Sequence, residues 1–215
     1  AWIYYGSMTG ISGSSQLEIN LASANFGSSV ALAGDVNGDG FSDVIIGASS
    51  YSNPEFLEGA AFVYNGSSSG INTTPSWQTQ SNQTLTNLGI SVAGAGDVNG
   101  DGYSDVIVGA FNFENGQTDE GKIQVHHGSQ TGLSTTASWT IESNTANANL
   151  GVSVASAGDV NGDGYSDVIA GAYRFANGNT GEGKAFVYYG GGGGGNARAN
   201  VQQYSPGSGS VVSSG

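Results

Sequence analysis

The chain has 215 residues, of which 38 are glycine and none is cysteine, and its 17 acidic residues against four lysines and arginines give a formal net charge of −13. The scarcity of cations excludes a basic surface for nucleic acid, and the lack of cysteine excludes disulfides and thiol chemistry. No apolar run approaches the roughly 20 residues of a membrane-spanning helix, so we expect no membrane insertion.

The first recurring element is a short apolar segment at the start of the chain. Residues 1–6, Ala-Trp-Ile-Tyr-Tyr-Gly, align with residues 61–66, 123–128 and 185–190. Aromatic and β-branched residues favour strands, so we expect a strand in each copy. Eleven residues after the closing glycine of each copy, an apolar residue in a polar setting marks a further strand: Leu17, Trp77, Trp139 and Val201.

A second element, residues 34–48, carries an acidic pattern around which each repeat is built. It reads Gly-Asp-Val-Asn-Gly-Asp-Gly-Phe-Ser-Asp-Val-Ile-Ile-Gly-Ala and returns twice at a spacing of 62 residues. A fixed period predicts a repeated structural unit. The β-branched run after each acidic loop predicts a buried strand, so the loop connects one strand to the next.

Each copy contains the pattern D-x-N-x-D-G-x-x-D, whose oxygens are the hard donors that calcium prefers. Side-chain oxygens at positions 1, 3 and 5, a main-chain carbonyl at position 7 and a closing carboxylate wrap such an ion. An EF-hand closes instead with an acid at position 12, which is Ile46 here. We therefore predict three Ca²⁺ sites, one per loop. The predicted ligands are Asp35, Asn37, Asp39, Phe41, Asp43, Asp97, Asn99, Asp101, Tyr103, Asp105, Asp159, Asn161, Asp163, Tyr165 and Asp167.

An ordinary turn is the alternative interpretation of these loops, because Asn-Gly and Asp-Gly are common hairpin dipeptides. A turn requires neither the first nor the last aspartate of the pattern, yet both return in all three copies. The three loops also hold nine of the 17 acids. Without a cation, their mutual repulsion would strain the folded chain, which favours the calcium interpretation.

The repeated residues resemble a known family. Phe26-Gly27 followed by Ser-Ser-Val-Ala, the aspartate loop and Val-Ile-Ile-Gly-Ala is similar to the FG-GAP repeat of integrin α-subunits and their bacterial relatives. The later copies begin with Leu88-Gly89 and Leu150-Gly151, and the proline of Gly-Ala-Pro is absent. Over about residues 1–190, the resemblance implies an all-β propeller whose blades have four antiparallel strands, with calcium in the loop between the first two strands.

The repeats divide the chain into three full blades and part of another. The predicted segments are residues 1–20 (an N-terminal half-blade with strands 3 and 4), 26–83 (blade 1), 88–144 (blade 2), 150–204 (blade 3) and 205–215 (a Gly/Ser-rich tail). Propellers close with about four to eight blades, so three and a half blades do not close alone. Two alternatives stay open: a fragment of a larger propeller, or a homo-oligomer in which strands of one chain complete another as a ring or filament.

These observations favour a calcium-stabilised module with a structural or adhesive role, which binds a protein or glycan partner. Calcium loops of low affinity fill at the millimolar calcium found outside cells, so we expect an extracellular or cell-surface location. A carbohydrate-binding lectin is the alternative function. A polysaccharide-active enzyme is disfavoured, because near-identical units do not gather unlike catalytic residues at one site, and we expect no enzymatic activity.

Overall fold

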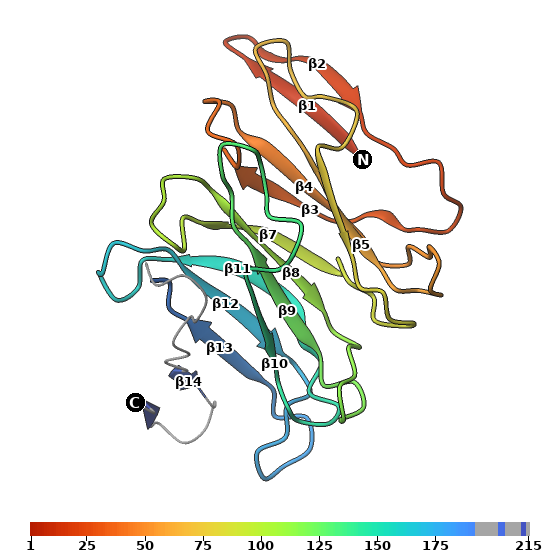
Figure 1. Ribbon diagram of the computed structural model, residues 1–215, viewed down its shortest axis with the longest axis vertical. Helices are drawn as coiled ribbons and strands as arrows, with labels where there is room; N and C mark the ends of the chain where they lie inside the picture. The colour runs from red at the N-terminus through yellow and green to blue at the C-terminus, as the bar shows by residue number, and fades with distance from the viewer. Residues whose placement is uncertain (192–201, 205–211, 214–215) are drawn as a thin grey trace.

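The computed structural model describes residues 1–191, 202–204 and 212–213, in which every regular element is a β-strand. Three large sheets and one small sheet lie side by side along the molecule (Figure 1). The small sheet contains β1 (Trp2–Ser7) and β2 (Gly10–Gln16). The first large sheet contains β3 (Phe26–Gly34), β4 (Asp43–Ala48), β5 (Ala60–Tyr64) and β6 (Trp77–Gln80). The second contains β7 (Ser91–Gly96), β8 (Asp105–Ala110), β9 (Lys122–His126) and β10 (Trp139–Glu142). The third contains β11 (Leu150–Gly158), β12 (Asp167–Ala172), β13 (Lys184–Tyr188), β14 (Gln202–Tyr204) and β15 (Val212–Ser213).

Consecutive strands pair antiparallel within each large sheet, as expected for strands joined by local connections. The register between the second and third strand is the same in all three: Val44 faces Tyr64, Val106 faces His126 and Val168 faces Tyr188. The predicted all-β fold with four-stranded antiparallel blades is thereby confirmed. We call the three large sheets blades 1, 2 and 3.

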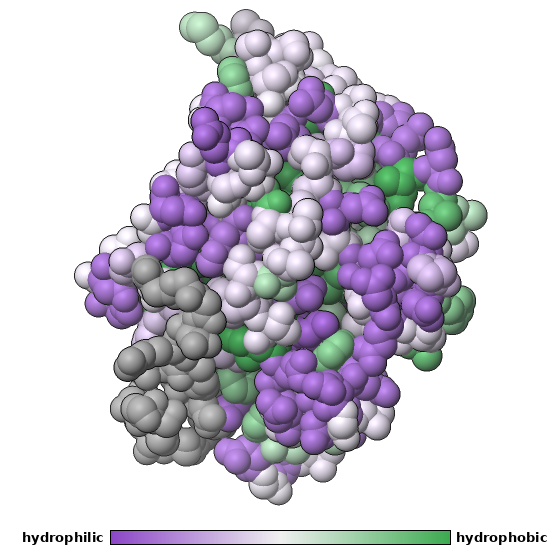
Figure 2. Space-filling model, viewed as in Figure 1, coloured by the Kyte–Doolittle hydropathy of each residue, from purple (hydrophilic) through white to green (hydrophobic). Residues whose placement is uncertain are grey.

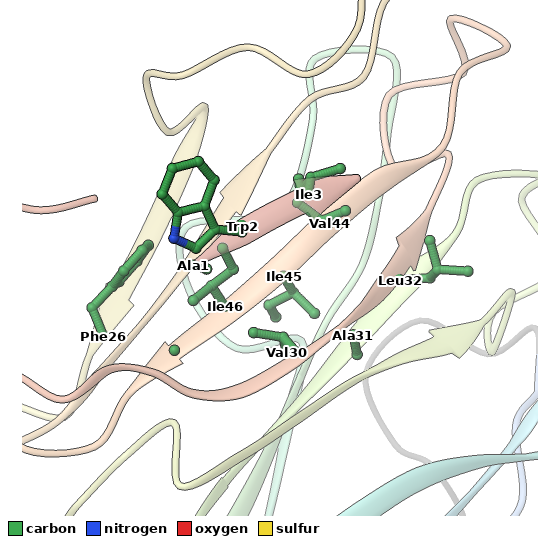
Figure 3. A pocket seen from close by; sticks show the side chains of 11 residues that line it. Ala1, Trp2, Ile3, Phe26, Val30, Ala31, Leu32, Val44, Ile45 and Ile46 are labelled. Atoms are coloured by element: carbon green, nitrogen blue, oxygen red, sulfur yellow. The ribbon is translucent and has the colours of Figure 1, made fainter. Parts of the chain in front are cut away.

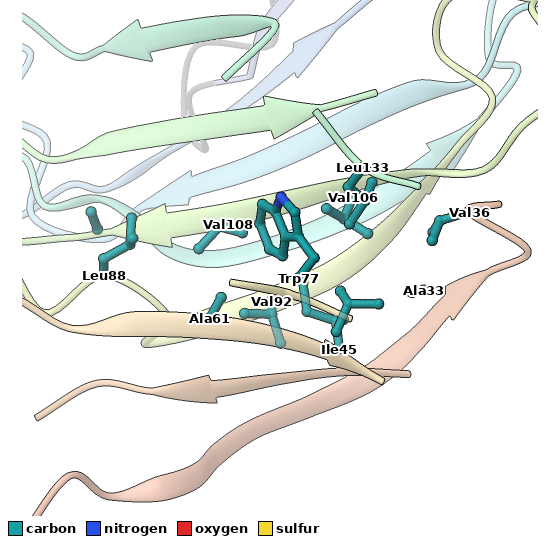
Figure 4. Close-up of a cluster of buried hydrophobic side chains, with 12 residues drawn as sticks. Ala33, Val36, Ile45, Ala61, Trp77, Leu88, Val92, Val106, Val108 and Leu133 are labelled. Carbon is teal, nitrogen blue, oxygen red and sulfur yellow. The ribbon is translucent and has the colours of Figure 1, made fainter. Parts of the chain in front are cut away.

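The blades pack face to face through apolar side chains that alternate along each strand. Ile45 on β4 and Val63 on β5 point from blade 1 into a cluster that also contains Val106 and Val108 of blade 2. The ring of Trp77 lies in the same cluster (Figure 4). Because strand side chains alternate with a period of two, the intervening residues face the other neighbour. Complete burial of a valine or isoleucine stabilises the fold by about 1.5–3 kcal/mol, so these clusters hold the blades together.

Adjacent blades also approach so closely that a side chain is excluded at one repeated contact. A Cβ atom on Gly47 would lie 1.9 Å from the carbonyl oxygen of Gly89, and one on Gly109 would lie 2.0 Å from that of Gly151. Among the described residues, the equivalent Gly171 of blade 3 has no such neighbour, since the nearest atom to its Cβ would be 3.7 Å away. In both contacts the glycine of Gly-Ala in one repeat meets the glycine of Leu-Gly in the next, which gives a steric reason for glycine at these two positions.

The small N-terminal sheet packs against blade 1 through Ala1, Ile3 and Leu17, which join a cluster with Phe62 and Tyr64 (Ala1 and Ile3 are labelled in Figure 3). Its second strand differs from the sequence interpretation. We aligned Leu17 with Trp77, but Leu17 exchanges main-chain hydrogen bonds with Ala1, and this places it two residues out of register with Trp77, which pairs with Val63. The tight turn after Ser7 lets β2 begin at Gly10, where the large blades have a long loop.

Blade 3 departs from the predicted four strands at its end. The segment 205–215, expected as a linker, contributes β15, which pairs with β14 and gives blade 3 a fifth strand. Val201 and the rest of that segment lie outside the described residues. Hydrophilic residues and residues of intermediate hydropathy share the face shown in Figure 2, with hydrophobic ones scattered among them.

Candidate metal centres in the three acidic loops

The first aspartate of each acidic loop folds the loop around its own carboxylate. Asp35 accepts main-chain hydrogen bonds from Gly38 (2.7 Å) and Asp39 (3.0 Å) at Oδ1, and from Gly40 (2.8 Å) at Oδ2. Asp97 and Asp159 make the same three contacts in their own loops, at 2.7–3.1 Å. The glycines of the loop adopt positive φ, with values of 73° at Gly38 and 86° at Gly40, which a residue with a side chain rarely adopts.

The third and fifth positions lie side by side in each loop. The side-chain amide of Asn37 donates to Asp39 Oδ2 at 2.9 Å, and Asp39 Oδ1 accepts the main-chain N–H of Phe41 at 2.9 Å. The corresponding pairs in the other loops are 2.9 Å and 2.8 Å apart. The side-chain amide and the carboxylate therefore lie next to each other at the solvent-exposed tip of each loop, with the amide nitrogen directed at the carboxylate and the amide oxygen accepting the main-chain N–H of the aspartate.

The closing aspartate is buried and connects three segments of its blade. Asp43 Oδ2 accepts the main-chain N–H of Val36, and Oδ1 accepts that of Gly66, both at 2.9 Å. Asp105 and Asp167 repeat these contacts at 2.8–2.9 Å. We predicted this residue as a calcium ligand, and the structure shows that each of its oxygens already accepts a main-chain hydrogen bond. The carboxylate thus ties the start of the loop to the end of the third strand.

The acidic groups within a loop influence one another electrostatically. Burial raises the pKa of Asp43, and the nearby charges of Asp39 and Asp35 raise it further. In blade 2, burial raises the pKa of Asp105 to about 7, with a further contribution from Asp101 and Asp97, although two main-chain hydrogen bonds act in the opposite direction. A cation among these groups would remove the repulsion, so the loops fit a cation in charge as well as in donor type.

The side-chain acids alone do not make a complete coordination sphere. Among the residues that the structure describes, no three histidine or acidic side chains converge as a metal-binding group. A cation in loop 1 would therefore also need the amide oxygen of Asn37 and the main-chain carbonyl of Phe41. All of these oxygens are hard donors, as calcium requires. The 15 predicted ligands remain a prediction.

Neighbouring loops contact each other, in part through Ser104 and Ser166, to which the sequence interpretation assigned no role. The main-chain N–H of Ser104 donates to the carbonyl oxygen of Asp35 at 3.0 Å, and Ser166 donates to Asp97 at 2.9 Å. The ring of Tyr103 covers Gly38 of the preceding loop, where a Cβ atom would lie 2.6 Å from its Cε1 atom. The recurrence of serine immediately before the closing aspartate was the available sequence signal.

A glutamate that recurs once per repeat accepts main-chain hydrogen bonds within the loop before the third strand. Buried Glu58 accepts main-chain hydrogen bonds from Asn53 at 2.7 Å and from Asn82 at 3.1 Å. Glu120 accepts one from Asn115 at 2.6 Å. Glu182 is exposed and accepts one from Asn177 at 3.1 Å. These glutamates hold loops in place and do not gather into a catalytic site.

The fold and the loops define a propeller-type repeat protein with one acidic hairpin per blade. Comparison with known families agrees: residues 26–68 match the FG-GAP repeat, and residues 97–170 match the FG-GAP-like repeat. The chain belongs to the FG-GAP repeat family.

Integrin α-subunits are among its relatives. The chain is 31% identical to integrin alpha-8 of Mus musculus over 172 residues, which is 76% of the chain and 15% of that protein. It is 34% identical to integrin alpha-4 of Xenopus laevis over 152 residues, 69% of the chain and 14% of that protein. It is 39% identical to integrin alpha-5 of Xenopus laevis over 105 residues, 47% of the chain and 10% of that protein. The chain thus spans at most 15% of these relatives.

Within the residues that the structure places, no helix has the length and apolar character to span a membrane.

Proposed function

We propose that the chain is a calcium-stabilised β-propeller module that acts outside the cell or at its surface in adhesion or another protein interaction. The observation that carries the proposal is the threefold repetition of one loop geometry, in which the first aspartate makes the same three hydrogen bonds each time. The similarity to integrin α-subunits supports the adhesive role.

The residues of each loop have distinct parts in this mechanism. Asp35 shapes the loop, Asn37 and Asp39 would turn their side-chain oxygens to the ion at the exposed tip, and buried Asp43 anchors the loop to the rest of the blade. A bound Ca²⁺ would supply the positive charge that cancels the repulsion among the carboxylates. The connection between the first two strands of each blade would then be rigid, and the blade would present its other loops to a partner.

Calcium titration and removal test this proposal. Isothermal titration calorimetry should show three sites, with the weak affinity of about 10⁻⁴–10⁻³ M that is typical of extracellular modules. At a tenfold excess over the dissociation constant, each site stabilises the fold by about 1.4 kcal/mol, so a chelator should lower the melting temperature by many degrees. Identical melting curves with and without the chelator would contradict a structural role for the metal.

A second candidate function, carbohydrate binding, is favoured by a polar cavity between blades 1 and 2. The cavity has a volume of about 300 Å³ and lies beside the first acidic loop, and its lining includes Asn65, Ser76, Gln130, Thr131 and Trp77. Amide and hydroxyl groups around an aromatic ring suit a neutral sugar. A glycan array distinguishes this function from protein adhesion: the lectin interpretation requires binding that is lost on substitution of Gln130 by alanine.

A further inference from the structure

The chain contains six asparagine–glycine pairs, each of which lies outside the strands: residues 37–38, 65–66, 99–100, 115–116, 161–162 and 177–178. Asparagine is a thermolabile residue, because its side-chain amide can react with the main-chain nitrogen that follows it. Glycine at the next position favours this reaction, since it has no side chain to hinder the approach of the two groups. The contacts of each pair in the folded chain therefore decide which pair reacts.

Four of the six pairs are held through the main-chain N–H of their glycine. In the acidic loops, Gly38, Gly100 and Gly162 each donate this N–H to the first aspartate of the loop at 2.7 Å. Gly66 donates its N–H to Asp43 Oδ1 at 2.9 Å. The glycine nitrogen must lose this proton when it attacks, and a hydrogen-bonded amide releases its proton only when the bond opens. The four pairs are therefore protected.

The fifth pair, Asn115–Gly116, is held through the side chain of its asparagine. Asn115 is exposed in the loop between β8 and β9, and its Nδ2 atom donates to Glu142 Oε2 at 3.0 Å. Rotation of the amide toward Gly116 would break this hydrogen bond. The pair therefore has partial protection from a single side-chain contact.

The sixth pair, Asn177–Gly178, lies in the equivalent loop of blade 3 and lacks this contact. Tyrosine stands at position 204, 62 residues after Glu142, so the carboxylate acceptor of blade 2 is not repeated. Within the described part of the chain, no hydrogen bond holds the side-chain amide of Asn177 or the N–H of Gly178, although the N–H of Asn177 donates to Glu182 at 3.1 Å. Both residues of the pair are exposed. The two reacting groups are thus free to approach each other.

We propose that Asn177 is the site at which the folded chain is modified by deamidation. The main-chain nitrogen of Gly178 attacks Cγ of Asn177 and forms a new C–N bond. The side-chain nitrogen leaves as ammonia and takes the proton that Gly178 releases. Water then opens the resulting succinimide ring at either of its carbonyl carbons. The product is aspartate or isoaspartate at position 177, and the reaction consumes only water.

The modification would change a loop that Glu182 holds together. Glu182 accepts the main-chain N–H of Asn177 and, at 2.6 Å, the side-chain amide of Asn179. A new carboxylate at position 177 would repel that of Glu182, and isoaspartate would also lengthen the main chain by one carbon atom. The loop of blade 3 would loosen, whereas the equivalent loop of blade 2 would keep its structure.

The test uses each pair as its own control. The native chain is incubated at mildly alkaline pH in calcium buffer beside a sample unfolded in guanidinium chloride, and peptide mapping by mass spectrometry gives the deamidation rate of each pair. The ratio of the unfolded to the native rate is the protection of that pair. We expect little protection at Asn177 and roughly five- to tenfold protection at Asn115, which is the effect of one hydrogen bond to a carboxylate. Protection at the other four pairs should be larger still.

Two variants test the reason for this difference. Glu142→Ala removes the acceptor of the Asn115 amide, so the rate at Asn115 should rise to that at Asn177, while the rate at Asn177 stays the same. Asn177→Gln should remove most of the isoaspartate that forms in the native chain, measured by methyl transfer with an isoaspartate methyltransferase, because glutamine would have to form a larger ring.

Three results would overturn the proposal. The first is protection of Asn177 as strong as that of Asn115, and the second is faster deamidation of any other pair in the native chain. The third is an unchanged rate at Asn115 in Glu142→Ala, because the contrast between the two loops would then have another cause. The protection measured in the native chain decides the proposal even where Glu142→Ala lowers the stability of the fold.

Discussion

Ser104 donates its main-chain N–H to the carbonyl oxygen of Asp35, 3.0 Å away in the preceding blade. Ser166 and Asp97 repeat this bond at 2.9 Å. The first residue of an acidic loop is thus fixed both by its own carboxylate and by the following blade. The first two acidic loops are therefore part of the interfaces between blades, and their side chains can be changed while these main-chain bonds remain.

Substitution of Asp101 by alanine should remove one calcium site and leave the other two. Asp101 supplies the carboxylate at position 5, and its Oδ1 atom accepts the main-chain N–H of Tyr103 at 3.0 Å. Titration calorimetry should show the stoichiometry fall from three to two. Glu114→Ala removes the same charge from an exposed position of blade 2 and should leave all three sites. An unchanged stoichiometry and affinity in Asp101→Ala would contradict the ligand assignment.

The glycine contact between blades should make equivalent substitutions unequal. A methyl group at Gly109 would lie 2.0 Å from a carbonyl oxygen, so Gly109→Ala should destabilise the fold by about 1–3 kcal/mol through overpacking. The methyl group of Gly171→Ala meets no atom of the described part of the chain closer than 3.7 Å, so this change should alter the free energy of unfolding by less than about 0.5 kcal/mol. Urea unfolding measures both. Equal losses in the two variants would show that the cost is not steric.

Glu58 and Glu182 provide a similar comparison for the loop before the third strand. Each oxygen of the buried Glu58 carboxylate accepts one main-chain N–H, and Glu58→Gln places an NH₂ group opposite one of these donors. We therefore expect the free energy of unfolding to fall by about 1–3 kcal/mol. Glu182 is exposed, so water replaces its hydrogen bonds, and Glu182→Gln should have little effect. Differential scanning calorimetry of the two variants in saturating calcium tests this difference. A stable Glu58→Gln variant would show that the buried carboxylate is dispensable.

His126 should make the chain less stable in acid. Burial lowers its pKa from 6.5 to about 4, so between these values the unfolded chain binds a proton that the folded chain does not. The stabilisation of the folded chain by neutral His126 is complete above about pH 6.5 and is lost as the pH falls toward about 4. Over this range the free energy of unfolding should fall by about 3 kcal/mol.

The repeat itself supplies the control for His126, since tyrosine occupies the same register at positions 64 and 188. The difference in unfolding free energy between the native chain and His126→Tyr should change with pH in this window, whereas effects of acid on the calcium loops cancel in the comparison. A difference that does not vary with pH would show that His126 does not titrate on unfolding.

The repeated parts of the fold could be predicted from the sequence. The 62-residue period and the β-branched runs predicted the blades, and the hairpins form where the acidic pattern placed them. The interface between blades was not predictable in the same way. The Gly-Ala dipeptide does not by itself show that Gly47 contacts Gly89, because this contact depends on the distance between two sheets. The 62-residue period indicates only that contacts between blades repeat.

The parts that differ from the repeat were also the parts that the sequence misplaced. Leu17 was aligned by its distance from a glycine, but the short turn of the N-terminal sheet shifts the register by two residues, and Leu17 still reaches the core beside Tyr64. For the candidate site, donor types were evident from the pattern. The double main-chain contact of Asp43 was not, because Gly66 is 23 residues away and meets the loop only in the folded blade.

The close approach of Gly47 and Gly89 has a consequence for how repeats are added to such a protein in evolution. Each 62-residue unit carries a Gly-Ala at one face and a Phe-Gly or Leu-Gly at the other, so it contains both halves of the junction. Tandem duplication of one unit would therefore create a new junction whose two surfaces are already complementary, without any compensating substitution. An array of this kind can be lengthened in a single genetic step.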